Sequence, residues 1–300
     1  MHLRLLAISF YALVLVGPTL LLADTASENS AFQQITTNPG VDIEPKWSPD
    51  GKWLSYGSAN HGPENLWIVP SEGGAPIQLT TDLAYVHSSW WSPDGKRIAF
   101  SGGTPVERQE DMRNHILLIS PDGGEPQQLT NGPIDGAPCW SPDGQKIAFV
   151  SIRSGHWDIW LKPVDGGDAV QLTDDPALDH SGRWSPDGSQ IAFHSMRSGN
   201  ADIWLVSADG GEPVPLTTSE AEDMFPSWSP DGKKIAFQSS RTGNDDIYVI
   251  SLEDKSLSQI TSSPAKDGRP TWSPDGNKIA FSSDRSGNLD LWVVDLKRLN

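Results

Sequence analysis

Short apolar stretches, bounded by polar residues and turn sequences, follow one another along most of the chain. Residues 234–238 read Lys-Ile-Ala-Phe-Gln and residues 246–250 read Asp-Ile-Tyr-Val-Ile, a pattern typical of half-buried β-strands. An extended segment at 225–228 precedes them and is followed by a Ser-Pro-Asp-Gly turn, while 257–261 follows after a second turn. Proline, aspartate and glycine suit the successive positions of such turns. The pattern predicts a four-stranded antiparallel meander.

This unit is repeated. The pentapeptide Trp-Ser-Pro-Asp-Gly begins at Trp47, Trp91, Trp140, Trp184, Trp228 and Trp272, at intervals of 44, 49, 44, 44 and 44 residues. A fixed period near forty residues indicates one small supersecondary unit in series, too small to bury its own apolar face. Radial stacking of such sheets buries both faces of each and leaves only short edges. We therefore predict an all-β fold, a six-bladed β-propeller of four-stranded antiparallel blades.

The two ends of the repeat region predict how the ring closes. The last copy reaches Asn300 without a Gln-Leu-Thr strand, and the related Gln-Ile-Thr occurs at residues 34–36, before the first motif. We expect this N-terminal strand to complete the last blade, so that the propeller occupies residues 32–300 without a second domain.

The N-terminal segment differs in kind. Arg4 precedes an apolar run over residues 5–22, and small and polar residues follow. This is typical of a secretory signal peptide over residues 1–26, cleaved after Ala23 or Ala26. A retained N-terminal anchor is the alternative, because the run is nearly long enough to span a bilayer. Both interpretations place the propeller in the periplasm or outside the cell.

Charge and cysteine content narrow the classes of partner. The formal net charge is −17, which disfavours nucleic-acid binding because the phosphate backbone is also negative. Cys139 is the only cysteine, so an intramolecular disulfide is excluded. We expect a buried, inert thiol and a monomeric protein.

The repeat Trp-Ser-Pro-Asp-Gly, Ile-Ala-Phe, Ser-x-Arg-Ser-Gly-Asn, Asp-Ile-Trp and Gln-Leu-Thr resembles the PD40 repeat of TolB-like β-propellers over about residues 32–300. The resemblance implies the propeller fold and a protein-binding role outside the cytoplasm. TolB carries an additional N-terminal α/β domain that has no counterpart in this sequence. Similar repeats accompany the hydrolase domain of prolyl-oligopeptidase-like peptidases, but a Gly-x-Ser-x-Gly nucleophile motif is absent here.

Aligning the copies separates a uniform face from a variable face. The Ser-Pro-Asp-Gly turns join the first and second strands and recur in every blade, which indicates a structural role. The opposite face carries the loops between the second and third strands and the links between blades. The longest such loop, residues 102–114, contains Glu107, Arg108 and Arg113. Trp90 and Trp157 depart from the repeat, and we expect them to contact a ligand toward this variable face.

An acidic residue stands five positions before the motif tryptophan in five of the six blades. These residues are Asp42, Asp135, Asp179, Asp223 and Asp267. Ringed around the channel mouth, they would attract a cation or a basic group of a partner; the alternative is that each aspartate caps its own link turn. We also expect Arg153, Arg197, Arg241 and Arg285 to pair with the aspartate five residues later, across the loop between the second and third strands.

Two functions follow. The first is a non-catalytic extracytoplasmic propeller that binds a protein or peptide, basic in character, at the variable face and without a cofactor. The second is a metal-assisted lyase or hydrolase acting on an oligosaccharide or small substrate. For a metal, His87 and His180 are the candidate ligands because they lie where first strands begin, and a divalent cation at the channel mouth is a further alternative. A metal requirement would separate the two functions.

Overall fold

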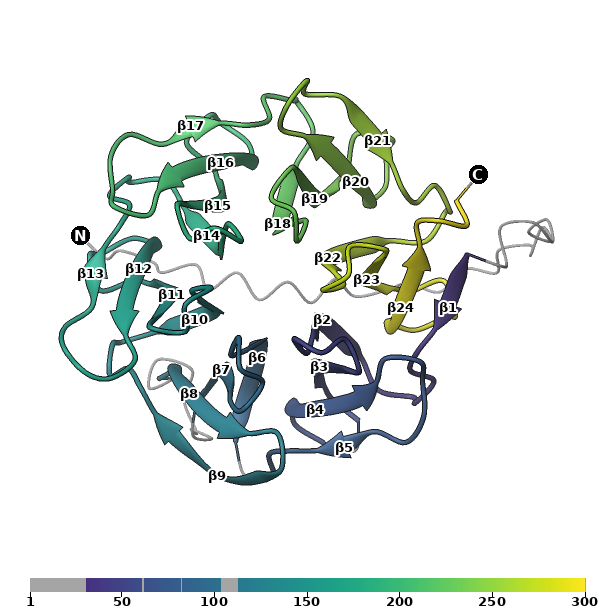
Figure 1. Ribbon diagram of the computed structural model, residues 1–300, viewed down its shortest axis with the longest axis horizontal. Coiled ribbons are helices and arrows are strands. Elements are labelled where there is room, and N and C mark those ends of the chain that lie inside the picture. The colour runs from purple at the N-terminus through teal and green to yellow at the C-terminus, as the bar shows by residue number, and fades with distance from the viewer. Residues whose placement is uncertain (1–30, 61, 82, 104–112, 300) are drawn as a thin grey trace, which may run out of the picture.

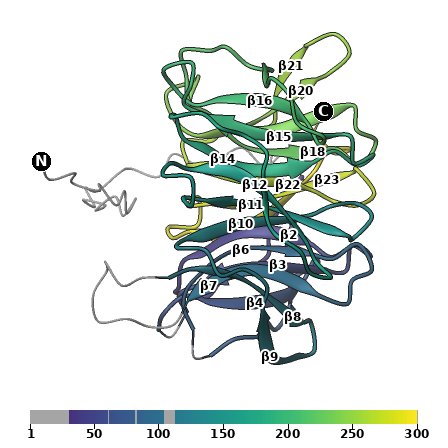
Figure 2. The same cartoon turned by 90° about the vertical axis from the view of Figure 1, so that its left-hand side faces the viewer.

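The computed structural model describes residues 31–60, 62–81, 83–103 and 113–299. Within these ranges six four-stranded antiparallel sheets surround a central axis (Figure 1). Seen from the side, the sheets form a disc whose two faces are made of turns and loops (Figure 2). The predicted six-bladed, all-β propeller is confirmed.

The strands of each blade are named A to D from the axis outward. The A strands are β2 (Asp42–Trp47), β6 (Ala84–Trp91), β10 (Asp135–Trp140), β14 (Asp179–Trp184), β18 (Asp223–Trp228) and β22 (Asp267–Trp272). The B strands are β3 (Trp53–Ser58), β7 (Ile98–Gly103), β11 (Lys146–Ser151), β15 (Gln190–Ser195), β19 (Lys234–Ser239) and β23 (Lys278–Ser283). The C strands are β4 (Asn65–Pro70), β8 (His115–Ser120), β12 (Asp158–Pro163), β16 (Asp202–Ser207), β20 (Asp246–Ser251) and β24 (Asp290–Asp295). The D strands are β5 (Ile77–Gln78), β9 (Gly123–Gln128), β13 (Val170–Gln171), β17 (Val214–Pro215), β21 (Leu257–Gln259) and β1 (Phe32–Gln34).

The ring closes through its N-terminal strand. The sixth blade has the strand order β1-β24-β23-β22, and β1 lies antiparallel to β24 with Phe32 opposite Val294. The backbone N–H of Ile35 donates to the carbonyl of Leu291 at 2.8 Å. The predicted non-covalent closure is therefore confirmed.

The motif tryptophans pack between blades. Trp228 of the fifth blade lies in one apolar cluster with Ile203 and Leu205 of the fourth. Its indole N–H donates to the carbonyl of Arg183 at 3.0 Å. Trp47 makes the same contact with Thr271 at 3.2 Å, joining the first blade to the last. Regular placement of these rings thus stabilises the contacts between blades.

The Ser-Pro-Asp-Gly turns also interlock around the ring. In the fifth blade Ser229 donates to Asp231 at 2.6 Å, and this hydroxyl hydrogen bond, together with one from the backbone of Lys233, lowers the pKa of the aspartate. Gly232 has φ +69°, a left-handed conformation that favours glycine. A Cβ there would contact Pro186 of the preceding turn at 3.8 Å.

The described residues include no helix of the length and apolarity that a membrane span needs.

Candidate functional site: the central channel

Each A strand bulges at the same place. In β14 the register with β15 shifts between His180 and Arg183, and an equivalent shift occurs in the other five blades. One residue in each bulge adopts a left-handed conformation without being glycine: Glu44, Ser88, Ala137, Ser181, Phe225 and Arg269, with φ between 45° and 59°. Such bulges redirect side chains and are common next to functional sites. Here they orient a layer of six side chains, of five residue types, close to the axis.

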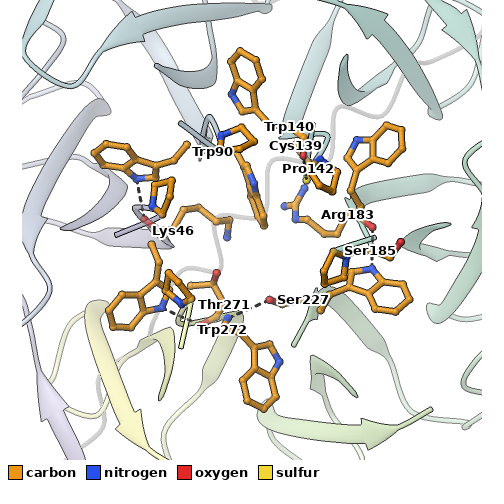
Figure 3. Close-up of a pocket in the computed structure, with 18 residues that line it drawn as sticks. Lys46, Trp90, Cys139, Trp140, Pro142, Arg183, Ser185, Ser227, Thr271 and Trp272 are labelled. Carbon is orange, nitrogen blue, oxygen red and sulfur yellow. Dashed lines mark hydrogen bonds between the residues drawn. The ribbon is translucent and has the colours of Figure 1, made fainter. Parts of the chain in front are cut away.

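The residue directly before each motif tryptophan lines the channel on the uniform face. These residues are Lys46, Trp90, Cys139, Arg183, Ser227 and Thr271 (Figure 3). They surround a cavity of about 240 Å³, together with motif tryptophans and prolines. The surrounding prolines, such as Pro49 and Pro93, are exposed, so the cavity reaches the surface. We call it the proline-ring pocket.

Sequence comparison of the repeats alone missed this pocket. The alignment treated the Ser-Pro-Asp-Gly side as uniform, although the position before each tryptophan differs in all six copies. That variation at a fixed place in a regular repeat was the available signal. Trp90 was expected toward the variable face, and this expectation was wrong, because Trp90 is the last residue but one of β6 and lines the pocket beside the Ser-Pro turns. Cys139 is buried, as predicted, and burial raises the pKa of its thiol.

Two cations from opposite blades reach into the proline-ring pocket. Lys46 of the first blade and Arg183 of the fourth are 4% and 5% exposed, and Figure 3 shows them extending from opposite sides. The Trp90 ring lies near both, 5.5 Å from the lysine Nζ and 4.9 Å from the arginine Cζ. Burial, and then the charge of Arg183, lowers the pKa of Lys46 to about 7.

An ion pair lies in the bulge layer. Nε of Arg269 is 3.3 Å from Oε1 of Glu44, and the hydroxyl of Ser88 also donates to this carboxylate. Burial alone would raise the pKa of Glu44, but Arg269, Lys46 and the Ser88 hydroxyl lower it to about 2. These inner residues thus carry three cations, Lys46, Arg183 and Arg269, against one carboxylate. The local excess of positive charge contrasts with the net charge of −17.

The five aspartates predicted to ring the channel mouth do not face it. Asp42, Asp135, Asp179, Asp223 and Asp267 are 0% exposed. In the fourth blade Arg197 donates to both oxygens of Asp179, at 2.9 and 2.6 Å. Arg153, Arg241 and Arg285 engage the corresponding aspartates at 2.6–2.9 Å. The expectation of an exposed acidic ring is corrected: four carboxylates are neutralised inside their own blades, and their role in binding a partner stays a prediction.

The expected arginine–aspartate pair across the loop was also wrong. Asp202 accepts a hydrogen bond from Ser198 at 2.6 Å instead, while Nε of Arg197 donates to Ser195 at 2.9 Å. Because Ser195 lies opposite Asp179 in the strand register, this bond turns the guanidinium inward onto the A strand. The first blade has no such arginine, and there the amide of Asn38 donates to Asp42.

Of the two histidines expected as metal ligands, His180 has a described side chain. His180 lies 5.5 Å from His194, ring centre to ring centre, and its Nδ1 is 2.9 Å from the hydroxyl of Ser181. Burial lowers the pKa of His180 to about 4. Trp157 lies on the variable face, as expected, and its ring contacts His180 edge-on at 6.0 Å. The side chain of His87 lies outside the described residues.

Another group could hold a metal within the described ranges. His156, Asp158 and Asp174 place ligand atoms within 4.8 Å of one another.

In the long loop of the second blade, Glu107 and Arg108 lie outside the described residues, whereas Arg113 is described and exposed.

Two family models of β-propeller domains match this chain. Residues 19–136 and 217–299 match the family model of the TolB beta propeller domain (PD40), and residues 156–244 match that of the Tricorn protease N-terminal beta propeller domain. No curated protein sequence matches the chain significantly.

Solved structures agree. A putative TolB from Agrobacterium tumefaciens is similar with 26% identity and a TM-score of 0.69, over 86% of this chain and 91% of that one. TolB from Acinetobacter baumannii is similar with 22% identity and a TM-score of 0.63, over 85% of this chain and 63% of that one. Oligogalacturonate lyase from Vibrio parahaemolyticus is similar with 14% identity and a TM-score of 0.60, over 90% of this chain and 94% of that one.

Proposed function

Because the chain belongs to the TolB β-propeller (PD40) family, we propose that it is a non-catalytic extracytoplasmic protein that binds a protein or peptide partner. The proposed binding surface is the variable face, formed by the B–C loops, the links between blades and the adjoining channel mouth. The N-terminal apolar segment supports export, and a cell-fractionation experiment on the tagged full chain tests it.

The observation that carries this proposal is the bulge layer. One backbone conformation recurs in all six A strands, yet the six positions hold five different residue types near the axis. Symmetry of the backbone with asymmetry of the side chains suits recognition of one irregular partner, because function lies in the groups placed on a fold. Two of these groups retain solvent contact: the Arg269 side chain is 33% exposed, and Phe225 is half-buried.

The charge that we propose for the part of the partner at the channel is opposite to the one expected from the sequence. A basic partner was expected from five exposed carboxylates, but those carboxylates are buried. The bulge layer next to this face instead holds Arg269, which is 33% exposed and paired with Glu44, and the cations Lys46 and Arg183 lie beyond it toward the uniform face. Electrostatic complementarity therefore favours an acidic or polar group of the partner at the channel.

Capture from a cell-envelope extract tests the proposal. Met196 is 39% exposed in a B–C loop of the variable face, whereas Val214 is 55% exposed at the outer edge of the same blade. With the intact chain as bait, Met196→Glu should lower the yield of the captured partner about tenfold, and Val214→Glu should leave it unchanged. Equal yields from both variants would place the partner elsewhere.

A metal-assisted enzyme is the second candidate, and the group of His156, Asp158 and Asp174 favours it. Imidazole with carboxylates suits a divalent transition metal. Titration of the protein with Mn²⁺ and Zn²⁺, followed by calorimetry, should then show one saturable site that disappears in His156→Ala. Absence of saturable binding in the unaltered protein would remove this candidate.

A further inference from the structure

The proline-ring pocket combines buried positive charge with an absence of negative charge. Lys46 and Arg183 are the charged residues among those that line it, and no aspartate or glutamate does so within the described part of the chain. Two like charges in a poorly solvated cavity repel each other strongly, because water screens them little. A bound anion would relieve this repulsion.

Lys46 is buried without a hydrogen-bonded or directly ion-paired group at its amine. Within the described ranges its Nζ forms neither a hydrogen bond nor an ion pair; it lies over the face of Trp90, and the carboxylate of Glu44 acts on it only from a longer distance. Buried charged groups are normally paired, so an ammonium left unpaired and directed into a cavity calls for a ligand. Figure 3 shows the amine pointing into the opening.

Arg183 is only partly satisfied. Its Nη1 donates to the carbonyls of Gly182 at 3.0 Å and Ala137 at 3.4 Å, and these are the hydrogen bonds that its guanidinium forms among the described residues. The remaining N–H groups form a planar fork, which suits a carboxylate. The other walls are largely indole and proline rings, which suit a flat apolar body.

We propose that the proline-ring pocket binds a carboxylate attached to a small apolar group, held between Lys46 and Arg183 and stacked on Trp90. A free organic acid and the C-terminal carboxylate of a peptide share this chemistry. The site lies on the face opposite to the proposed partner surface, so its existence does not depend on the proposed function.

The proposal implies pH-dependent binding near neutrality. The groups that act on Lys46 are Arg183, Glu44, Arg269 and Cys139. Glu44 has a pKa of about 2 and stays ionised, burial holds the thiol pKa of Cys139 above its ordinary value, and the arginines stay cationic. His180, in the layer above, has a pKa of about 4 and stays neutral. Lys46 is therefore the group that changes charge between pH 6 and pH 8.

Isothermal titration calorimetry of the full chain with benzoate tests the site, with benzamide as the neutral control probe. We expect saturable benzoate binding at pH 6, at least tenfold weaker benzamide binding, and a loss of benzoate affinity of up to about tenfold at pH 8 as Lys46 deprotonates. Titration in two buffers of different ionisation enthalpy should show proton uptake at pH 7.5. Acetyl-Phe, which carries a peptide-like C-terminal carboxylate, is then compared with benzoate to distinguish a peptide terminus from a free acid, and its amide is the neutral control.

Lys46→Met keeps the length of the side chain and removes its charge, and Lys52→Met, at an exposed turn position, is the matched control. The first should weaken benzoate at least tenfold and abolish the pH dependence, while the second should change neither. Equal affinity for benzoate and benzamide, or equal affinity in the two variants, would overturn the proposal. If Lys46→Met fails to fold, a lack of proton uptake in the unaltered protein overturns it.

Discussion

Lys46 shows how one buried charge couples the channel to pH. Its pKa is about 7 in the folded protein, against 10.5 as its ordinary value. Between these values the unfolded chain binds more protons than the folded one, so stability rises with pH. Below pH 7 the lysine is protonated in both states, and its contribution no longer changes.

We therefore expect the free energy of unfolding of the unaltered protein to rise relative to Lys46→Met by about 3 kcal/mol between pH 6 and pH 9. Chemical denaturation of both proteins at several pH values measures this difference. Since both share all other titrating groups, their difference isolates Lys46. Parallel pH profiles would show that the lysine titrates normally in the fold.

Asp179 and Arg197 form a buried pair that breaks if one partner loses its charge. Burial raises the pKa of Asp179, while hydrogen bonds from Ser195 and Arg197 oppose that rise. The Arg197 side chain is only 14% exposed, so an uncompensated guanidinium there is poorly solvated. Asp179→Asn should reduce the free energy of unfolding by about 2–3 kcal/mol.

Asp165→Asn, at an exposed turn, is the control and should change stability by less than about 0.5 kcal/mol. Urea denaturation of both variants makes the comparison. If Asp179→Asn leaves stability unchanged but weakens partner capture, the aspartates act in binding, as their spacing first suggested.

At the scale of the element, the bulge of each A strand shapes the inner surface of the propeller. Ala137 holds a left-handed conformation with φ 49°, which costs little for glycine and much for a β-branched residue. Ala137→Val should therefore lower the free energy of unfolding by about 2 kcal/mol or more. Ala137→Gly should change stability by less than about 1 kcal/mol, because relief of strain offsets the lost methyl contact.

Thermal and chemical denaturation of the two Ala137 variants tests this conformation. A glycine variant destabilised as strongly as the valine variant would indicate that side-chain packing, and not backbone conformation, governs this position. The same comparison applies to the other five bulges, since the register shifts at the corresponding place.

The limits of the sequence pattern are visible in the same elements. Motif spacing and apolar periodicity predicted the strands and the number of blades, because a repeat needs neighbours to bury its faces. The bulge is not encoded by glycine, so nothing in the pattern marked the left-handed position of Phe225 or Arg269. Pairing of Arg197 with Asp179, 18 residues away, depends on the strand register that places Ser195 opposite the aspartate. Spacing alone could not reveal it, and it favoured the nearer Asp202 instead.

At the scale of the whole molecule, the joint between β1 and β24 is the one blade contact on which ring closure depends without a covalent connection. Ile35, after β1, and Leu79, after β5, occupy equivalent places beside Thr36 and Thr80, and both are buried, at 5% and 8% exposure. Each threonine accepts a hydrogen bond at 2.9 Å from the C strand of its blade. The two sites therefore differ mainly in their place along the chain.

Ile35→Ala and Leu79→Ala should lower global stability by similar amounts, about 2–4 kcal/mol, because both remove buried apolar groups. Local opening should differ, because β1 can detach without unfolding a blade, whereas β5 is continuous with blades on both sides. The N–H of Asp295 donates to the carbonyl of Ala31 at 2.8 Å and reports that opening. Hydrogen exchange at Asp295 should accelerate at least tenfold in Ile35→Ala under conditions where Leu79→Ala leaves it unchanged. Equal exchange in both variants would mean that the ring opens only by unfolding as a whole, and that its non-covalent joint is as secure as the covalent ones.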